Sequence, residues 1–229
     1  MLRYLRCCVR TMSNTREQYK DAAKLLDPAS TVAKITKRTK LENENAKFVN
    51  LEKLEYVSPL GKQGVWEIAT RTTKPKGSLV DAVIIVPILK YPNGDKKLVF
   101  VRQFRPPCNG VVVEFPAGLV DPNDSIETCA LRELKEETGY VGVIRKKTGV
   151  VWSDPGLVDA NCSMVWVDVD MSLKENKTPV PHWMDNECIE VVDVPLNELE
   201  GKIDEWTKQG YLIDGRVQTL VIGMAMANE

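Results

Sequence analysis

The alternation of apolar and polar residues predicts strands and helices over the C-terminal two thirds of the chain. Residues 81–89 are apolar almost without a break, which is typical of a strand covered on both faces of a sheet. Helices are expected at 196–209, where apolar residues recur at helical spacing, and at 216–228. Further strands are expected at 98–103, 111–115, 142–151, 163–169 and 189–195. This order indicates an α/β fold, an α/β/α sandwich around a mixed sheet.

The N-terminal part of the chain has a different pattern. An amphipathic helix is expected at 15–26, before Asp27-Pro28, and a polar linker at 30–46. Two strands at 48–56 and 65–72, joined by a turn, predict a small antiparallel β annex outside the main core. We therefore divide the chain into an N-terminal extension (1–44), the annex (45–76) and a main α/β domain (77–229).

Composition limits the classes of partner. The chain has 229 residues, of which 43% are hydrophobic and 28% charged, enough for one sizeable core and a smaller annex. The net charge of −1 gives no reason to expect nucleic acid or an anionic membrane surface as a partner. No apolar run approaches the roughly 20 residues that a membrane span requires.

The cysteines and the single histidine exclude several kinds of site. The six cysteines form no CxxC pair, and we interpret them as reduced thiols of a reducing compartment. Cys129 is interpreted as a small core residue rather than a nucleophile. With His182 as the only histidine, a histidine-rich metal site and a two-histidine mechanism are excluded.

Residues 1–15 leave the location of the protein open. They contain Arg3, Arg6 and Arg10 among apolar residues and no acid, a composition that resembles a mitochondrial presequence. The alternative is a disordered basic extension. We expect a cytoplasmic or nuclear protein in the second case and a mitochondrial one in the first.

A helix is expected to begin near Asp124 and to end before Gly139. Asp124 with Glu127 three residues later matches a capping box, and Gly139 suits a left-handed C-terminal cap. Apolar residues recur every four positions and predict one buried face. That face contains Ile126, Cys129, Ala130 and Leu134.

Three glutamates share the other side of this helix. Glu133, Glu136 and Glu137 stand at i, i+3 and i+4, so their like charges repel unless a cation lies among them. Arg132 can pair with one of them, and a divalent cation with oxygen ligands is the natural partner of the set. Such a metal indicates chemistry on a phosphate-bearing substrate. The alternative, a solvated charged surface, does not explain the Gly- and Pro-rich loop 115–122, whose backbone can approach a ligand closely.

The segment from Gly118 to Gly139 resembles the signature box of the Nudix hydrolase family. Asp124 stands where the family has Glu, and Tyr140 where it has an aliphatic residue. In the family that first Glu braces the loop against the helix, and we expect Asp124 to preserve the loop because Asp also caps helices well. The residues that match are Gly118, Arg132, Glu133, Leu134, Glu136, Glu137 and Gly139.

Three further segments, 102–107, 114–118 and 153–157, resemble the ADP-sugar pyrophosphatases within this family. Some animal relatives also act on oxidised guanine nucleotides. The resemblance implies that Arg105 contacts the diphosphate, for which a planar guanidinium is well suited. The alternative for Arg105 is a salt bridge with Glu114.

The resemblance also implies substrate-binding residues in the annex. Trp66 corresponds to an aromatic residue that stacks on the base, and Arg71 to an arginine contributed across a homodimer. Phe48 stands where the relatives have a second stacking tryptophan. Core packing within the annex is the alternative for both aromatic residues. Leu119 and Asp154 complete the implied set.

The resemblance implies hydrolysis of ADP-ribose and related ADP-sugars to AMP and a sugar 5-phosphate. The expected cofactor is Mg²⁺, with Mn²⁺ as the alternative, and the number of ions stays open. The implied ligands are the carbonyl of Ala117 and the carboxylates of Glu133, Glu136 and Glu137. Glu187, just before strand 189–195, or one of Glu136 and Glu137 would activate the attacking water. Asp185 is the alternative base.

Two other functions stay open at this point. One is hydrolysis of oxidised guanine nucleoside diphosphates, which would serve to clean the nucleotide pool. The other is a non-catalytic Nudix module that binds nucleotides. Such modules typically lose the carboxylates of the box, which are retained here.

Overall fold

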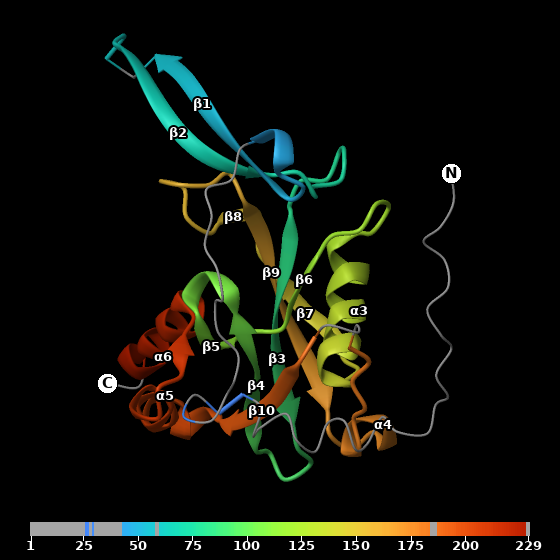
Figure 1. Cartoon of the computed structure of the whole chain (residues 1–229). Helices are drawn as coiled ribbons and strands as arrows, with labels where there is room; N and C mark the ends of the chain where they lie inside the picture. Colours follow the sequence, from blue (N-terminus) through green and yellow to red (C-terminus); the bar gives the residue numbers. More distant parts are fainter. Residues whose placement is uncertain (1–25, 28, 30–42, 58–59, 184–186, 228–229) are drawn as a thin grey trace.

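The computed structural model describes residues 26–27, 29, 43–57, 60–183 and 187–227 (Figure 1). The basic stretch 1–15 lies outside these residues, as does the helix expected at 15–26 apart from Leu26. Leu26 itself is buried in the main core. In the described part of the chain, no helix is both long and apolar enough to cross a membrane.

A mixed sheet forms the centre of the main domain. Its strand β3 pairs in parallel with β9 and antiparallel with β4, and the strand order is β11-β5-β4-β3-β9-β7. Three other strands are attached to this path: β10 to β4, β6 to β3 and β8 to β9. The bounds are β3 (Ala82–Lys90), β4 (Lys96–Arg105), β5 (Gly110–Glu114), β6 (Ala117–Leu119), β7 (Val143–Lys147), β8 (Val151–Trp152), β9 (Asn161–Asp170), β10 (Ile189–Pro195) and β11 (Leu212–Ile213).

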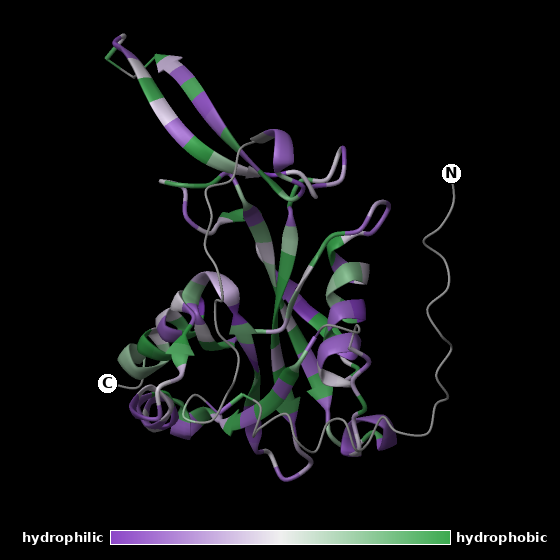
Figure 2. Cartoon of the chain, viewed as in Figure 1, coloured by the Kyte–Doolittle hydropathy of each residue, from purple (hydrophilic) through white to green (hydrophobic). Residues whose placement is uncertain are grey.

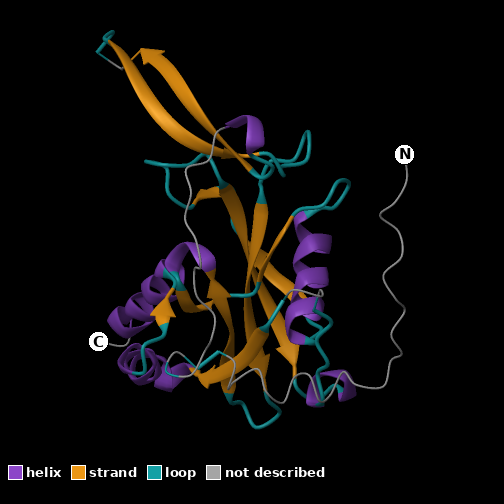
Figure 3. Ribbon diagram, viewed as in Figure 1, coloured by secondary structure: helices purple, strands orange, loops and turns teal. Residues whose placement is uncertain are grey.

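Helices cover both faces of this sheet, which confirms the expected α/β/α sandwich (Figure 3). Helix α3 (Ile126–Thr138) packs on one face, and α5 (Leu199–Lys208) and α6 (Gly215–Ala227) on the other. Leu98 and Phe100 of β4 belong to the core under α5 and α6, and Val99 between them belongs to the core under α3. The shorter helical turns are η1 (Asn43–Asn45), η2 (Pro106–Cys108), α4 (Lys174–Lys177) and η3 (Leu196–Glu198).

The annex is a hairpin of β1 (Val49–Val57) and β2 (Gln63–Arg71) that forms a separate two-stranded sheet. It projects from the main body in Figure 1, and apolar and polar residues alternate along it in Figure 2. Large apolar side chains stay exposed on it, among them Leu51, Val57 and Val65, each more than half exposed. A two-stranded ribbon cannot bury such residues by itself.

The elements differ from the sequence expectations in three places. The strand expected at 142–151 is broken into β7 and β8. Between them the Thr148 hydroxyl accepts from the Met164 N–H, and the Ser163 hydroxyl donates to the Thr148 carbonyl. Within the loop expected at 115–122, residues 117–119 form strand β6 beside β3. The helix expected at 196–209 begins with the separate turn η3. The first two changes involve contacts with distant segments.

Candidate active site

Helix α3 is fixed at both ends by its own sequence. Ser125 is the N-cap and forms a capping box with Thr128, so the expectation that Asp124 and Glu127 form this box was wrong. At the other end Gly139 adopts φ 76° and donates its N–H to the Lys135 carbonyl, as expected for a left-handed cap. Cys129, Ala130 and Leu134 are buried, as their spacing predicts.

Asp124 does not cap the helix because its carboxylate pairs with Arg132. One carboxylate oxygen of Asp124 lies 3.3 Å from Arg132 Nη2, and Asp121 lies 3.2 Å from the same nitrogen. The other end of the guanidinium contacts Glu133 at 2.8 Å and Glu136 at 3.1 Å. Arg132 therefore joins the preceding loop to the glutamates of α3, and Asp124 braces the loop although it is shorter than Glu.

Gly118 allows the side chain of Glu133 to lie directly on the backbone of β6. A Cβ atom built on Gly118 would lie 1.9 Å from Glu133 Cδ and 2.1 Å from its Oε1. No side chain fits in that space with Glu133 where it is. The backbone of the Gly-rich loop, expected to approach a ligand closely, here lies against the Glu133 carboxylate of α3.

Ala117 turns its backbone toward Glu137. Its N–H donates to Glu137 Oε2 at 3.1 Å. The carbonyl of the preceding residue, Pro116, accepts from Ile85 of β3 at 2.8 Å. Because successive residues of a strand direct their N–H and C=O groups to opposite sides, the Ala117 carbonyl points away from β3 and toward the side of Glu137. This orientation suits the role predicted for it as a metal ligand.

Negative charge gathers around these groups. Burial, followed by the neighbouring Glu133 and Glu114 carboxylates, raises the pKa of Glu137 to about 8, although the Ala117 N–H opposes the shift. Burial also raises the pKa of Glu133 to about 6, against the pull of the Arg132 guanidinium. Glu187 contributes to that second shift, so its carboxylate lies within electrostatic range of Glu133. Asp185, the alternative base, lies outside the described residues.

The donor set fits a hard divalent cation. Among the residues that the structure describes, no three acidic, histidine or cysteine side chains already surround one ion position. Arg132 instead holds Glu133 and Glu136, and the Ala117 N–H holds Glu137. A cation would offset both the burial and the weaker carboxylate repulsion that raise these two pKa values. Carboxylate oxygens with a backbone carbonyl are ligands that Mg²⁺ and Mn²⁺ prefer.

Arg105 borders this acidic cluster and pairs with Glu114. Its Nε lies 2.7 Å from Glu114 Oε1, so the salt bridge considered as the alternative is present. Burial raises the pKa of Glu114 although the Arg105 cation opposes the rise. The Arg105 side chain is 43% exposed, and its solvent-facing part can still reach a phosphate. The salt bridge and phosphate binding are therefore compatible.

Comparison with known proteins supplies the family. Residues 80–214 match the NUDIX domain. The chain belongs to the Nudix family of hydrolases. It is 42% identical to the ADP-ribose pyrophosphatase of Saccharomyces cerevisiae, over 96% of this chain and 91% of the relative. It is 36% identical to the ADP-sugar pyrophosphatase of Mus musculus, over 80% of this chain and 84% of the relative.

A solved structure supports the Nudix fold independently. The crystal structure of an ADP compounds hydrolase aligns with a TM-score of 0.51 at 23% identity, covering 69% of this chain and 77% of the other. At this identity the likeness concerns the fold alone. It agrees with the α/β/α sandwich and the mixed sheet described above.

The annex of this Nudix hydrolase places its predicted substrate residues far from one another. Trp66 pairs with Leu54 across the hairpin, whereas Phe48 lies opposite Thr72, which is six residues after Trp66 and just beyond the end of β2. At about 3.3 Å per residue the two aromatic residues are roughly 20 Å apart, too far to enclose one base within a single chain. Arg71 is exposed at the end of β2.

Core packing does not account for the two annex aromatics in a single chain. Phe48 is 68% exposed and Trp66 is 49% exposed. The indole N–H of Trp66 donates to the Gly156 carbonyl at 3.0 Å, and its ring meets Tyr56 edge to face. That contact brings Trp66 to the turn that contains the predicted substrate residue Asp154.

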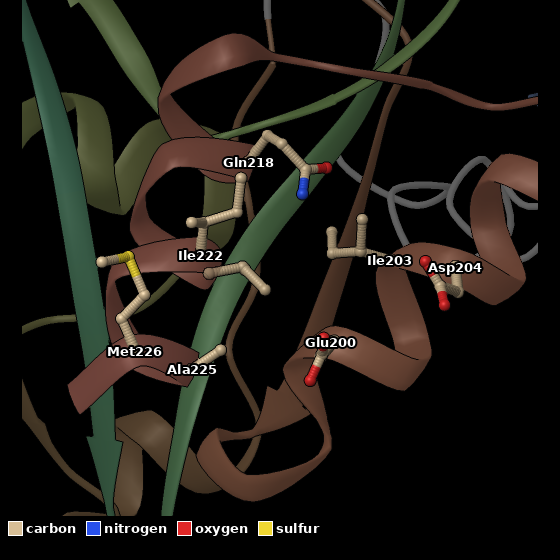
Figure 4. Close-up of a pocket in the computed structure, with 8 residues that line it drawn as sticks. Glu200, Ile203, Asp204, Gln218, Ile222, Ala225 and Met226 are labelled. Atoms are coloured by element: carbon tan, nitrogen blue, oxygen red, sulfur yellow. The ribbon is translucent and has the colours of Figure 1, made fainter. Parts of the chain in front are cut away.

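A hollow on the opposite side of the Nudix sheet is separate from these residues (Figure 4). It lies between α5 and α6, with Ile203 and Ile222 in its lining and Glu200 and Asp204 among its polar groups. None of the predicted site residues lines it. The acidic surface of α3 therefore remains the candidate active site.

Two features of the site were missed in the sequence. Glu114 joins the acidic cluster beside Glu137, and its position at the end of a strand directly before the loop was the available signal. His182 and Trp183 contact the end of α3, and no local pattern indicated this. The carbonyl of Leu119, a predicted substrate-binding residue, accepts hydrogen bonds from Cys129 and Arg132.

Proposed function

We propose that this Nudix hydrolase cleaves the diphosphate of ADP-ribose and related ADP-sugars, giving AMP and a sugar 5-phosphate, with Mg²⁺ as the cofactor. The observation that carries the proposal is the 42% identity with the yeast ADP-ribose pyrophosphatase over nearly the whole of both chains. The retained glutamates of α3, with Arg105 beside them, give the chain the groups that such a reaction requires.

Each group of the site has a distinct task in this proposal. Glu133, Glu136, Glu137 and the Ala117 carbonyl would hold a divalent cation, which would neutralise diphosphate charge and lower the pKa of a bound water molecule. Arg105 binds a non-bridging phosphate oxygen through its exposed N–H groups. Glu187 accepts the proton of the water that attacks phosphorus. Arg132 keeps Glu133 and Glu136 in place from the loop side.

A homodimer would complete the substrate site. Trp66 and Phe48 are too far apart in one chain to hold the adenine between them, but two hairpins packed together could supply one ring each. The exposed apolar residues of β1 and β2 support such packing, because burying them would stabilise a dimer. Light scattering after size-exclusion chromatography tests this: a dimer mass is expected, and an active monomer would refute it.

The decisive assay is AMP release from ADP-ribose with Mg²⁺ present. Glu137→Gln should lower kcat by about 10³-fold or more, because it removes a buried carboxylate at the centre of the cluster. Glu127→Gln is the matched control on the same helix, where the Glu127 side chain is 44% exposed and pairs with Lys147. Retained turnover in Glu137→Gln would refute the assigned site. Faster turnover of an oxidised guanosine diphosphate than of ADP-ribose would refute the assigned substrate and leave the site intact.

A further inference from the structure

The C-terminal end of α3 is covered by the segment 179–183, which leads to the loop that carries Glu187. The backbone N–H of His182 donates to the Glu136 carbonyl at 2.7 Å. The indole Nε1–H of Trp183 donates to the Glu137 carbonyl at 2.9 Å. The last turn of a helix leaves its carbonyls without partners inside the helix, and these two bonds satisfy two of them.

The close packing of segment 179–183 on the end of α3 depends on Gly139. A Cβ atom on Gly139 would lie 2.3 Å from the Val180 nitrogen and 2.8 Å from the Pro179 carbonyl carbon. The segment therefore passes against the helix end at a distance that only glycine permits. Gly139 has two roles, since it also ends α3 in the left-handed conformation.

This contact limits where Glu187 can lie. Glu187 is four residues after Trp183, and a chain of that length spans at most about 14 Å. Two residues after Glu187, β10 begins at Ile189, which is fixed by pairing with Gln103 of β4. Glu187 is thus held between an attachment on the glutamate helix and an attachment on the sheet. Its carboxylate reaches the electrostatic range of Glu133.

We propose that Trp183 is a positioning residue for Glu187. Its indole N–H donates to the backbone carbonyl of Glu137, so that the chain leading to Glu187 starts from a fixed point on the glutamate helix. This rests on the proposed function, in which Glu187 accepts the proton of the attacking water. A base displaced from its productive position loses catalysis steeply, whereas substrate binding by other residues is unaffected.

The test removes one hydrogen bond and keeps the ring. Trp183→Phe should lower kcat by about tenfold, with KM within about twofold of wild type, because only the transition state uses the base. Trp166→Phe is the matched control: its indole also donates one hydrogen bond, to Asp168, on a strand that carries none of the site residues. That variant should keep wild-type kcat.

A double variant separates positioning from a purely structural role. In a Glu187→Gln background the added Trp183→Phe change should cost less than about twofold in kcat, because the residue through which it acts is already lost. Equal loss in both backgrounds, an unchanged kcat in Trp183→Phe, or full activity of Glu187→Gln would each overturn the proposal. Turnover of ADP-ribose by the wild-type enzyme is measured in the same experiment. If the wild type does not cleave ADP-ribose, the proposed substrate is wrong, and the four enzymes are compared again on the diphosphate that it does cleave.

Discussion

Replacing Gly118 by alanine should move the Glu133 carboxylate out of the acidic cluster. The new Cβ would lie 1.9 Å from Glu133 Cδ. Since carbon atoms in contact stay about 3.5–4 Å apart, the carboxyl group must retreat by roughly 1.5–2 Å. It would then lose its 2.8 Å contact with Arg132. A displacement of about 1 Å in a catalytic group can cost about 10²-fold, so kcat should fall by at least that factor.

The assay compares kcat, the Mg²⁺ concentration at half-maximal rate and the free energy of unfolding. Crowding in a packed region typically costs about 1–3 kcal/mol, so Gly118→Ala should remain folded while the Mg²⁺ requirement rises. Gly149→Ala is the matched control, because a Cβ at Gly149 meets no atom within 4 Å. A Gly118→Ala enzyme with kcat and Mg²⁺ requirement within twofold of wild type would refute the reasoning that Glu133 must lie against Gly118.

Two further predictions concern groups away from the acidic cluster. Burial of Asp214 opposes its ionisation, but hydrogen bonding with Arg216 outweighs this and holds its pKa below the ordinary value. Asp214→Asn should therefore lower the free energy of unfolding by about 1 kcal/mol at pH 7. This pH is well above the unfolded pKa of about 3.9, so the stabilisation by ionised Asp214 is fully present there. The difference should shrink as the pH falls through the folded pKa, and urea titrations that show the same difference at pH 3 and pH 7 would contradict it. Burial raises the pKa of Cys129 to about 12, whereas Cys108 is exposed. At pH 8 iodoacetamide should therefore label Cys108 in the folded protein, and label Cys129 only after urea unfolds it. Peptide mapping that finds equal labelling of both cysteines in the folded protein would disprove this.

Much of the site could be predicted because its central part is local. The glutamates of α3 share a face through helical spacing alone, and Gly139 ends the helix through its own backbone freedom. The order of apolar runs likewise predicted the sandwich, since a run such as 81–89 must be covered on both sides. The N-cap was the local error: Asp124 and Ser125 both suit it, and the pairing of Asp124 with Arg132 decided the outcome.

Only the tertiary structure decided the relations between distant segments. Pairing of β4 with β5 brings Arg105 to Glu114, and the path of 179–183 across α3 brings Trp183 to the carbonyl of Glu137. The register of the annex hairpin sets the separation of its two aromatic residues. Sequence alone determined which groups could take part, because helix spacing and turn chemistry act over a few residues. Their mutual distances depend on strand register and on packing between segments tens of residues apart, which no local pattern specifies.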